Sequence, residues 1–242
     1  MSPELSLDPI VRDLQIMAPA RNYSRWIYEQ FRPHLGRRVI ECGAGIGNFT
    51  ELLLDRELVV AVDAYQPCLE QLARRFAAEK QVVPVLMDIS SPRLLELSRH
   101  RPDTVICINV LEHVEDDVAA LINMWSILQP GGRLALLVPA YPILYGTIDR
   151  KIGHYRRYTK RVLTDRIARA GFQIRRLFCM NVIAPLGWFL NNRIFKRQEE
   201  SVAQVLFFDR FIVPWLRPAE RILNPPFGLS LIAVCEKPRN AA

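Results

Sequence analysis

Three glycines stand at alternate positions, Gly43, Gly45 and Gly47, directly after a short apolar run. A turn without side chains lets a ligand approach the backbone, and the N–H groups of a following helix add hydrogen-bond donors. Glu41 lies two residues ahead of the first glycine. Its carboxylate would repel a pyrophosphate but would receive a cationic amino group. The segment 40–50 therefore predicts a site for a positively charged cofactor.

The spacing of the glycines argues against a dinucleotide. A dinucleotide-binding turn reads G-x-G-x-x-G, and counted from Gly43 the sixth residue is Asn48, so the third glycine falls one place early. An NAD-dependent oxidoreductase stays open as an alternative, which protection by NADH in a thermal-shift assay would identify.

An acid followed by G-x-G-x-G resembles the first motif of the class I S-adenosylmethionine-dependent methyltransferases, of the type 11 or type 12 kind. Asp63, Asp88 and the segments 109–117 and 128–136 extend the resemblance in the same order, over roughly residues 37–140. The resemblance implies S-adenosylmethionine as the cofactor and S-adenosylhomocysteine as the product. The cofactor-binding residues that it implies are Glu41, Gly43, Ala44, Gly45, Gly47, Asp63, Ala64, Asp88, Ile89, Asn109, Val110 and Tyr23.

Three of these residues have specific implied roles. Asp63, at the end of the second predicted strand, would accept the ribose hydroxyls, although a nucleotide-binding Rossmann protein has an acid there too. Asp88, at the end of the third, would take the adenine amino group. Tyr23 lies in the segment 21–26, on a helix that the resemblance places over the cofactor. An acid at a strand end can also be only the N-cap of the next helix.

The resemblance places the methyl group past the end of the fourth strand, around Asn109 to His113. His113 is therefore a candidate catalytic residue. The alternative is a histidine at a helix start that only hydrogen-bonds the backbone.

The segment 145–159 resembles a D-x-x-x-G-H-x-R-R-Y signature found in a subgroup of the family. His154 is a candidate general base, because its ordinary pKa lies near the working pH. Arg156 and Arg157 could clamp a carboxylate or phosphate. The alternative is that Asp149, His154 and one arginine only brace a loop over the site.

Tyr141 and Trp188 complete a predicted substrate-binding set with Arg156 and Arg157. Cationic donors beside aromatic walls predict a small, acidic and partly hydrophobic metabolite as the methyl acceptor, with O-methylation favoured over N- or C-methylation. The alternative function is a non-catalytic binding or scaffold protein that keeps the methyltransferase fold.

Short β-branched runs alternate with segments of helical periodicity, which is typical of βαβ units and a parallel sheet. The expected fold is α/β, a Rossmann-like, doubly wound, seven-stranded sheet with its last strand antiparallel. Strands are expected at 37–42, 58–64, 82–88, 103–109, 132–139, 172–182 and 230–236, and helices at 49–56, 66–79, 91–100, 115–129 and 159–171.

The expected organisation is a single methyltransferase domain over 1–242. It divides into an N-terminal helical cap (1–36), a cofactor-binding core (37–180), an apolar insertion (181–229) and a last strand with its tail (230–242). The insertion is rich in Trp, Phe, Leu and Pro and must bury part of this surface. It could cap the substrate site, contact a second subunit of a homodimer, or rest peripherally on a membrane.

The composition excludes several other classes. The formal charge is +7, but no aromatic repeat or DNA-reading helix accompanies it, so no nucleic-acid partner is expected. The five cysteines are spread singly, with no histidine at zinc-ligand spacing, and are expected to be reduced, buried and free of metal. No apolar run is long enough for a transmembrane helix and the first residues do not resemble a signal peptide, so a cytoplasmic enzyme of small-molecule or secondary metabolism is expected.

Overall fold

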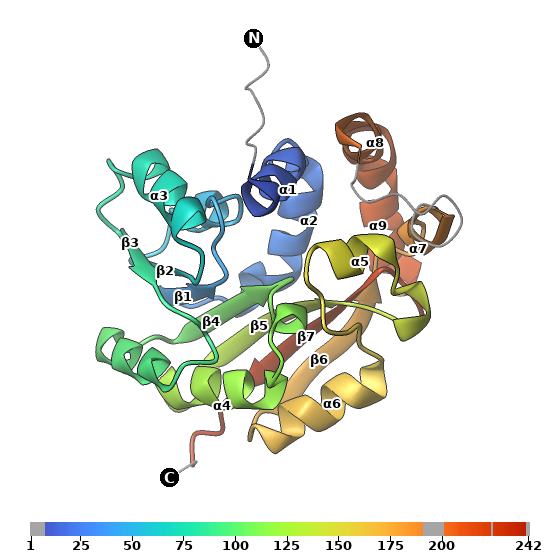
Figure 1. Cartoon of the computed structure of the whole chain (residues 1–242). Helices are drawn as coiled ribbons and strands as arrows, with labels where there is room; N and C mark the ends of the chain where they lie inside the picture. Colours follow the sequence, from blue (N-terminus) through green and yellow to red (C-terminus); the bar gives the residue numbers. More distant parts are fainter. Residues whose placement is uncertain (1–7, 191–200, 224, 241–242) are drawn as a thin grey trace.

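The structure, a computed structural model, describes residues 8–190, 201–223 and 225–240 (Figure 1). It contains a seven-stranded sheet of order β3-β2-β1-β4-β5-β7-β6, in which β7 runs antiparallel to both neighbours and the other pairs are parallel. The predicted sheet is thereby confirmed. Its strands are β1 (Arg38–Cys42), β2 (Leu58–Asp63), β3 (Val82–Leu86), β4 (Thr104–Ile108), β5 (Arg133–Pro139), β6 (Gln173–Met180) and β7 (Ser230–Glu236).

Helices cover both faces of the sheet (Figure 1). One face packs on α4 (Asp117–Ile127), α6 (Lys160–Arg169) and the 3-10 helix η3 (Pro92–His100), and the other on α2 (Arg21–Phe31), α3 (Gln66–Arg75) and α9 (Val213–Leu223). Side chains alternate along a strand, so Val105 of β4 enters the first core and Ile106 the second. This double burial explains why the central strands read as continuous apolar runs.

Two of the expected α-helices are 3-10 helices instead. The segment after the glycines forms only η2 (Thr50–Leu53), and the segment after β3 forms η3. At η2 the chain is held by long-range contacts: the Thr50 hydroxyl donates to Glu41, Arg75 pairs with Glu51, and Leu53 is buried. The α-helix predicted to present its N–H groups to a cofactor is therefore replaced by the single short turn η2.

The apolar insertion folds against the N-terminal helices. It contains α7 (Ala184–Phe189), α8 (Val202–Phe207), a π-helical turn η7 (Phe208–Ile212) and α9, and its residues 191–200 lie outside the described part. Asp209 accepts hydrogen bonds from the Asn22 and Tyr23 N–H groups at the start of α2, and Glu220 accepts from Asn181 and Val182. Both acids of the 202–223 helix thus point inward.

The loop between β5 and α6 closes on itself. The Tyr158 N–H donates to Pro139 and the Tyr141 N–H donates to Tyr158, which brings the two ends of the loop together. The loop carries η5 (Pro142–Leu144) and α5 (Thr147–Lys151), and it faces η4 (Leu111–His113), the turn that follows β4. The remaining helices are α1 (Pro9–Met17) and η1 (Arg32–His34).

All five cysteines are free and buried, as the sequence predicts. No helix in the described ranges is long and apolar enough to cross a membrane.

Candidate active site

The glycine loop lies at the carboxyl end of β1. Gly43, Gly45 and Gly47 have φ values of 75°, 54° and 84°, a region that disfavours residues with a Cβ. The N–H groups of Gly43 and Ala44 both donate to the Val62 carbonyl oxygen, at 2.8 and 2.9 Å, which holds the loop against β2. The loop conformation therefore depends on glycine at these positions.

Two acids flank this loop and fit the predicted cofactor. Glu41 is buried and accepts a 2.7 Å hydrogen bond from the Thr50 hydroxyl, and burial raises the pKa of its carboxyl to about 8. Asp63 accepts from the N–H groups of Gly45 and Tyr65, at 2.7 and 2.8 Å, while burial raises its pKa. A cationic amino group beside Glu41 would favour its ionised form, and each Asp63 oxygen keeps a lone pair for a ribose hydroxyl.

The other predicted cofactor residues lie at the same edge of the sheet. Asp88 is exposed after β3 and accepts hydrogen bonds from the Ser90 N–H and hydroxyl, while Ile89 beside it is buried. Asn109 directly follows β4, has a φ of 52° and is exposed. The Tyr23 ring meets Trp26 edge to face, with centroids 6.1 Å apart, and Trp26 is buried in the core. Ala64 directly follows β2, and Val110 comes next after Asn109.

A second helix over the loop, α1, is one that the sequence analysis missed. The Leu14 side chain lies over Gly45, where an added Cβ would come within 2.9 Å of it. The Asn48 side chain donates to the Leu14 carbonyl oxygen at 2.9 Å, and Tyr65 hydrogen-bonds Asp8. The signal for this helix was Asp8 itself, since its carboxylate caps the first turn of an apolar-periodic segment.

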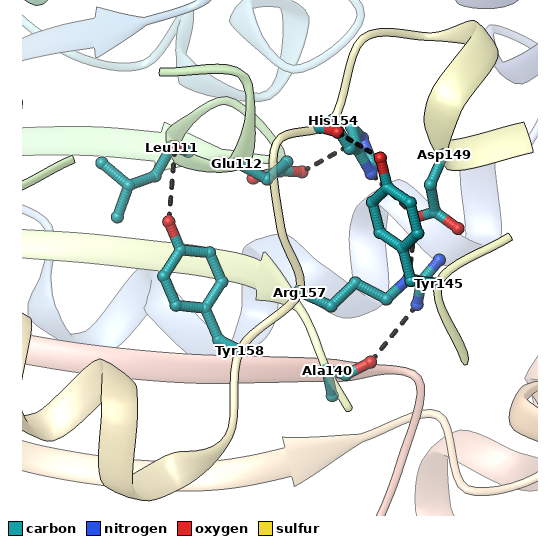
Figure 2. Close-up of polar contacts among 8 residues, drawn as sticks. All are labelled: Leu111, Glu112, Ala140, Tyr145, Asp149, His154, Arg157 and Tyr158. Carbon is teal, nitrogen blue, oxygen red and sulfur yellow. Dashed lines mark hydrogen bonds and ion pairs between the residues drawn. The ribbon is translucent and has the colours of Figure 1, made fainter. Parts of the chain in front are cut away.

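The predicted residues of the second motif converge on Asp149 (Figure 2). His154 Nδ1 lies 2.9 Å from Asp149 Oδ1, the Arg157 Nε donates to the same oxygen at 2.7 Å, and the Gly146 N–H donates to Oδ2 at 2.9 Å. Burial alone would raise the pKa of Asp149, but the contacts with His154 and Arg157 outweigh it and hold the pKa below its ordinary value. Because Asp149 is an ionised acceptor, His154 donates through Nδ1, and in the neutral imidazole its Nε2 carries the lone pair.

His113 and Glu112 bring the turn after β4 to the same place. The rings of His113 and His154 meet at 81° with centroids 4.6 Å apart. Burial, followed by the neighbouring His154, lowers the pKa of His113 to about 4. The His154 Nε2 lies 3.7 Å from Glu112 Oε1, and burial raises the pKa of the Glu112 carboxyl to about 8. Sequence analysis did not single out Glu112.

Both arginines predicted to clamp an anion contact protein acids. Arg157 is buried, with its Nη1 3.3 Å from the Ala140 carbonyl oxygen and its guanidinium 4.7 Å from the centre of the Trp188 ring. Arg156 pairs with Asp117 at 3.0 Å and donates to the Glu115 carbonyl oxygen at 2.6 Å. These contacts favour the bracing role that the sequence left open as an alternative.

The other two predicted substrate residues, Trp188 and Tyr141, contact different parts of the protein. Trp188 stacks on Arg157, whereas the Tyr141 hydroxyl donates to the Pro226 carbonyl oxygen at 3.3 Å and lies 3.6 Å from Cys179 Sγ. Tyr158, the last residue of the signature, is fully buried and donates to Asp117 Oδ2 at 3.0 Å. Asp117 was not predicted, because an acid in the first turn of a helix is common.

Comparisons with known proteins agree with this arrangement. The family model "Methyltransferase domain" matches residues 16–177. A ubiquinone biosynthesis O-methyltransferase of Alkalilimnicola ehrlichii is 29% identical over 121 residues, covering 50% of this chain and 45% of that protein. A demethylmenaquinone methyltransferase of Deinococcus radiodurans is 28% identical over 134 residues, covering 54% and 55%. The chain thus spans about half the length of the curated relatives it matches.

Solved structures share the fold. The N-methyltransferase NodS of Bradyrhizobium japonicum WM9, in complex with S-adenosylhomocysteine, superposes with a TM-score of 0.55 over 90% of this chain and 86% of that one, at 14% identity. The family match covers most of the chain, and the sheet order, the glycine loop and the acids at the ends of β1 to β3 agree with it. The chain therefore belongs to the methyltransferase domain family, within the class I S-adenosylmethionine-dependent methyltransferases.

Proposed function

We propose that the protein transfers a methyl group from S-adenosylmethionine to a hydroxyl oxygen of a small, partly hydrophobic molecule. The observation that carries this proposal is that the glycine loop and the 145–159 signature both contact η4. A Cβ on Gly43 would lie 2.1 Å from Val110 Cγ2, and the His113 N–H donates to the Val110 carbonyl oxygen at 2.9 Å. Val110 therefore links the glycine loop to His113, whose ring contacts that of His154.

His154 is suited to accept the proton of the attacking hydroxyl. Asp149 accepts a hydrogen bond from the Nδ1–H and fixes the ring, so Nε2 of the neutral imidazole is the proton acceptor. S-adenosylmethionine held at the glycine loop would supply an electrophilic methyl group. His154 would take the proton of the acceptor hydroxyl at Nε2 as that oxygen receives the methyl group.

The name of one relative supports oxygen as the acceptor atom, and the names of two support an apolar acceptor. These two are named for ubiquinone biosynthesis O-methylation and for demethylmenaquinone methylation, and we propose a hydroxylated ring with an apolar substituent for this chain. An acidic group on the substrate stays a prediction, since Arg156 and Arg157 contact Asp117 and Asp149.

We expect His154→Ala to lower kcat by about 10²- to 10⁴-fold with KM nearly unchanged, because a general base contributes about that much. The assay is transfer of labelled methyl to a panel of phenols, with calorimetric titration of S-adenosylhomocysteine as the control for the cofactor site. His100→Ala, at the end of η3, is the matched variant and should keep kcat. If kcat is unchanged in His154→Ala, His154 is not the general base.

We propose that the outer face of the 202–223 helix contacts an anionic lipid surface. Phe207, Phe211, Trp215 and Ile222 are 59%, 55%, 80% and 83% exposed, and their helical spacing places them on one face, here named the outer stripe. Arg210 and Arg221 are exposed beside this stripe, whereas both acids of the helix point inward. Exposed aromatic side chains beside exposed arginines fit the interface of an anionic bilayer. The expectation that the insertion buries its apolar side chains therefore holds only for its inner face, at Val213 and Leu216.

We expect the protein to cosediment with phosphatidylglycerol-containing vesicles and not with pure phosphatidylcholine vesicles. The double variant Phe211→Ser, Trp215→Ser should lose this binding, since it removes the central aromatic pair of the outer stripe. Leu95→Ser, an exposed leucine on η3, is the matched control and should bind normally. If the protein does not bind vesicles but forms a dimer, and the double variant is monomeric, the outer stripe instead contacts a second copy of this chain.

A further inference from the structure

Three potential metal ligands meet where η4 faces the loop after α5. One donor atom each from Glu112, His113 and His154 lies within 4.8 Å of the other two. The sequence predicts no metal site because these residues come from two distant segments, which only the fold brings together. Figure 2 shows two of the three, Glu112 and His154, facing each other. The loop that carries His154 is held by the Tyr145 hydroxyl, which donates to the His154 carbonyl oxygen at 2.7 Å.

The Glu112 carboxyl is the unusual member of this cluster. It is fully buried, and neither of its oxygens has a hydrogen-bond partner among the described residues. A buried carboxyl without hydrogen bonds is costly, and most such groups in proteins are paired or coordinate a metal. Glu112 therefore lacks a partner that its surroundings should supply.

The nearest atom to Glu112 Oε1 in the cluster cannot supply a hydrogen bond. Asp149 accepts a hydrogen bond from the His154 Nδ1–H, so in the neutral imidazole the Nε2 that faces Oε1 at 3.7 Å bears a lone pair. Once the Glu112 carboxyl is ionised, two acceptors face each other at a distance too long for a direct hydrogen bond. A cation between them would satisfy both.

We infer that Glu112, His113 and His154 bind one divalent transition-metal ion of the zinc class. Ligand bonds of about 2.0–2.2 Å in tetrahedral geometry place neighbouring donor atoms roughly 3.3–3.6 Å apart, close to the 3.7 Å between Nε2 and Oε1. The T-shaped contact of the two imidazoles is compatible with adjacent ligands of one ion. Two nitrogen donors favour zinc, cobalt or nickel over magnesium or calcium.

The surroundings match those of known metal sites. A ligating histidine usually donates its other ring N–H to a carboxylate, as His154 does to Asp149, and Arg157 in turn holds that carboxylate. His113 retains solvent exposure although its ring packs against that of His154, so the side of the cluster that it forms is open to a fourth ligand. Three protein ligands with an open position are typical of catalytic rather than structural sites.

The inference deepens the proposed function. The catalytic role of the ion rests on that function, whereas the binding of the ion does not. An ion here would lower the pKa of an acceptor hydroxyl that it ligates, and the hydroxyl proton would leave to solvent. His154 would then act as a ligand in place of a base.

The test is titration of chelator-treated protein with Co²⁺ and with Zn²⁺, followed by calorimetry and by the visible spectrum of Co²⁺. We expect a single site with a dissociation constant on the order of micromolar or below, and a four-coordinate Co²⁺ spectrum with nitrogen and oxygen ligands. His113→Ala, an exposed change that should fold normally, is expected to weaken binding at least about tenfold. Glu112→Gln should do the same, whereas His100→Ala should not.

The titration of S-adenosylhomocysteine separates this inference from the proposed function. The three variants should bind it as the wild type does, since none of the changed residues belongs to the glycine loop or its acids. The inference is overturned if neither ion binds at about 100 µM, which corresponds to less than roughly 5.5 kcal/mol of binding free energy. Binding that His113→Ala and Glu112→Gln both leave unchanged would overturn it equally, because the ion would then lie elsewhere.

Discussion

Asp149→Ala is expected to lower the free energy of unfolding by about 3–5 kcal/mol, the cost of removing one partner from a buried ion pair. Asp149 is fully buried and accepts from His154, Arg157 and the Gly146 N–H. Removal of the carboxylate takes away the hydrogen-bonded ion pair of the buried Arg157 guanidinium, which keeps its contacts with the Ala140 carbonyl oxygen and the Trp188 ring. For a chain of this size the melting temperature should fall by roughly 6–20 °C.

Two variants make this measurement specific. Asp165→Ala removes an exposed carboxylate whose nearest guanidinium nitrogen, on Arg169, is 4.0 Å away, and should change stability by less than about 0.5 kcal/mol. Asp149→Asn keeps the shape of the side chain and one acceptor oxygen, so its loss of stability should lie between those of Asp149→Ala and Asp165→Ala. Thermal unfolding of all three proteins decides the matter, and an Asp149→Ala melting temperature equal to that of Asp165→Ala would contradict the bracing role of Asp149.

Asp149 is also expected to act on turnover through His154. It is a positioning residue, because it holds the His154 ring and its tautomer without reaching the acceptor. Asp149→Asn should therefore lower kcat at temperatures where the variant remains folded. A loss of kcat without a change in S-adenosylhomocysteine affinity would separate this role from a general loss of structure.

The sheet could be predicted from sequence because its signal is local. Strands buried on both faces need continuous β-branched runs, and β7, expected at 230–236, is Ser230–Glu236 in the structure. The type of the intervening helices could not be predicted, because apolar spacing does not separate α from 3-10 geometry. η3 is fixed from outside its own segment: the Asn123 side chain donates to the carbonyl oxygens of Ile89, Ser90 and Ser91 just before it.

The candidate site likewise has one part that the sequence predicts and another that it does not. The glycine loop and its acids lie close in sequence, so spacing alone indicated them. The partner of Arg156 could not be read from spacing, since Asp117 belongs to another helix, whereas Asp149, the partner of Arg157, lies in the same signature. The same holds for Glu112, whose buried position beside His154 follows only from how the loop packs on η4.

Gly43→Ala is expected to weaken S-adenosylhomocysteine binding at least about tenfold, or by more than roughly 1.4 kcal/mol. A left-handed backbone costs an alanine about 1–2 kcal/mol. The Gly43 φ is 75°, and an added Cβ would lie 2.1 Å from Val110 Cγ2, a distance that real Cβ contacts do not show. Val110 is β-branched and stiff at χ1, so relief of the clash has to move the backbone of the loop or of η4.

The matched variant is Gly187→Ala in α7, the same chemical change at a glycine with no atom within 4 Å of the added Cβ and no left-handed φ. It should leave affinity unchanged and stabilise the helix by roughly 0.5–1 kcal/mol, while Gly43→Ala should lower the melting temperature by roughly 2–8 °C. Calorimetric titration of both proteins at a temperature where both are folded isolates the cofactor effect from stability. If Gly43→Ala binds S-adenosylhomocysteine as tightly as Gly187→Ala does, the cofactor does not approach the backbone at this loop. The loop would then serve only the packing of β1 against β2 and η4, and the assignment of its glycines to the cofactor would fail.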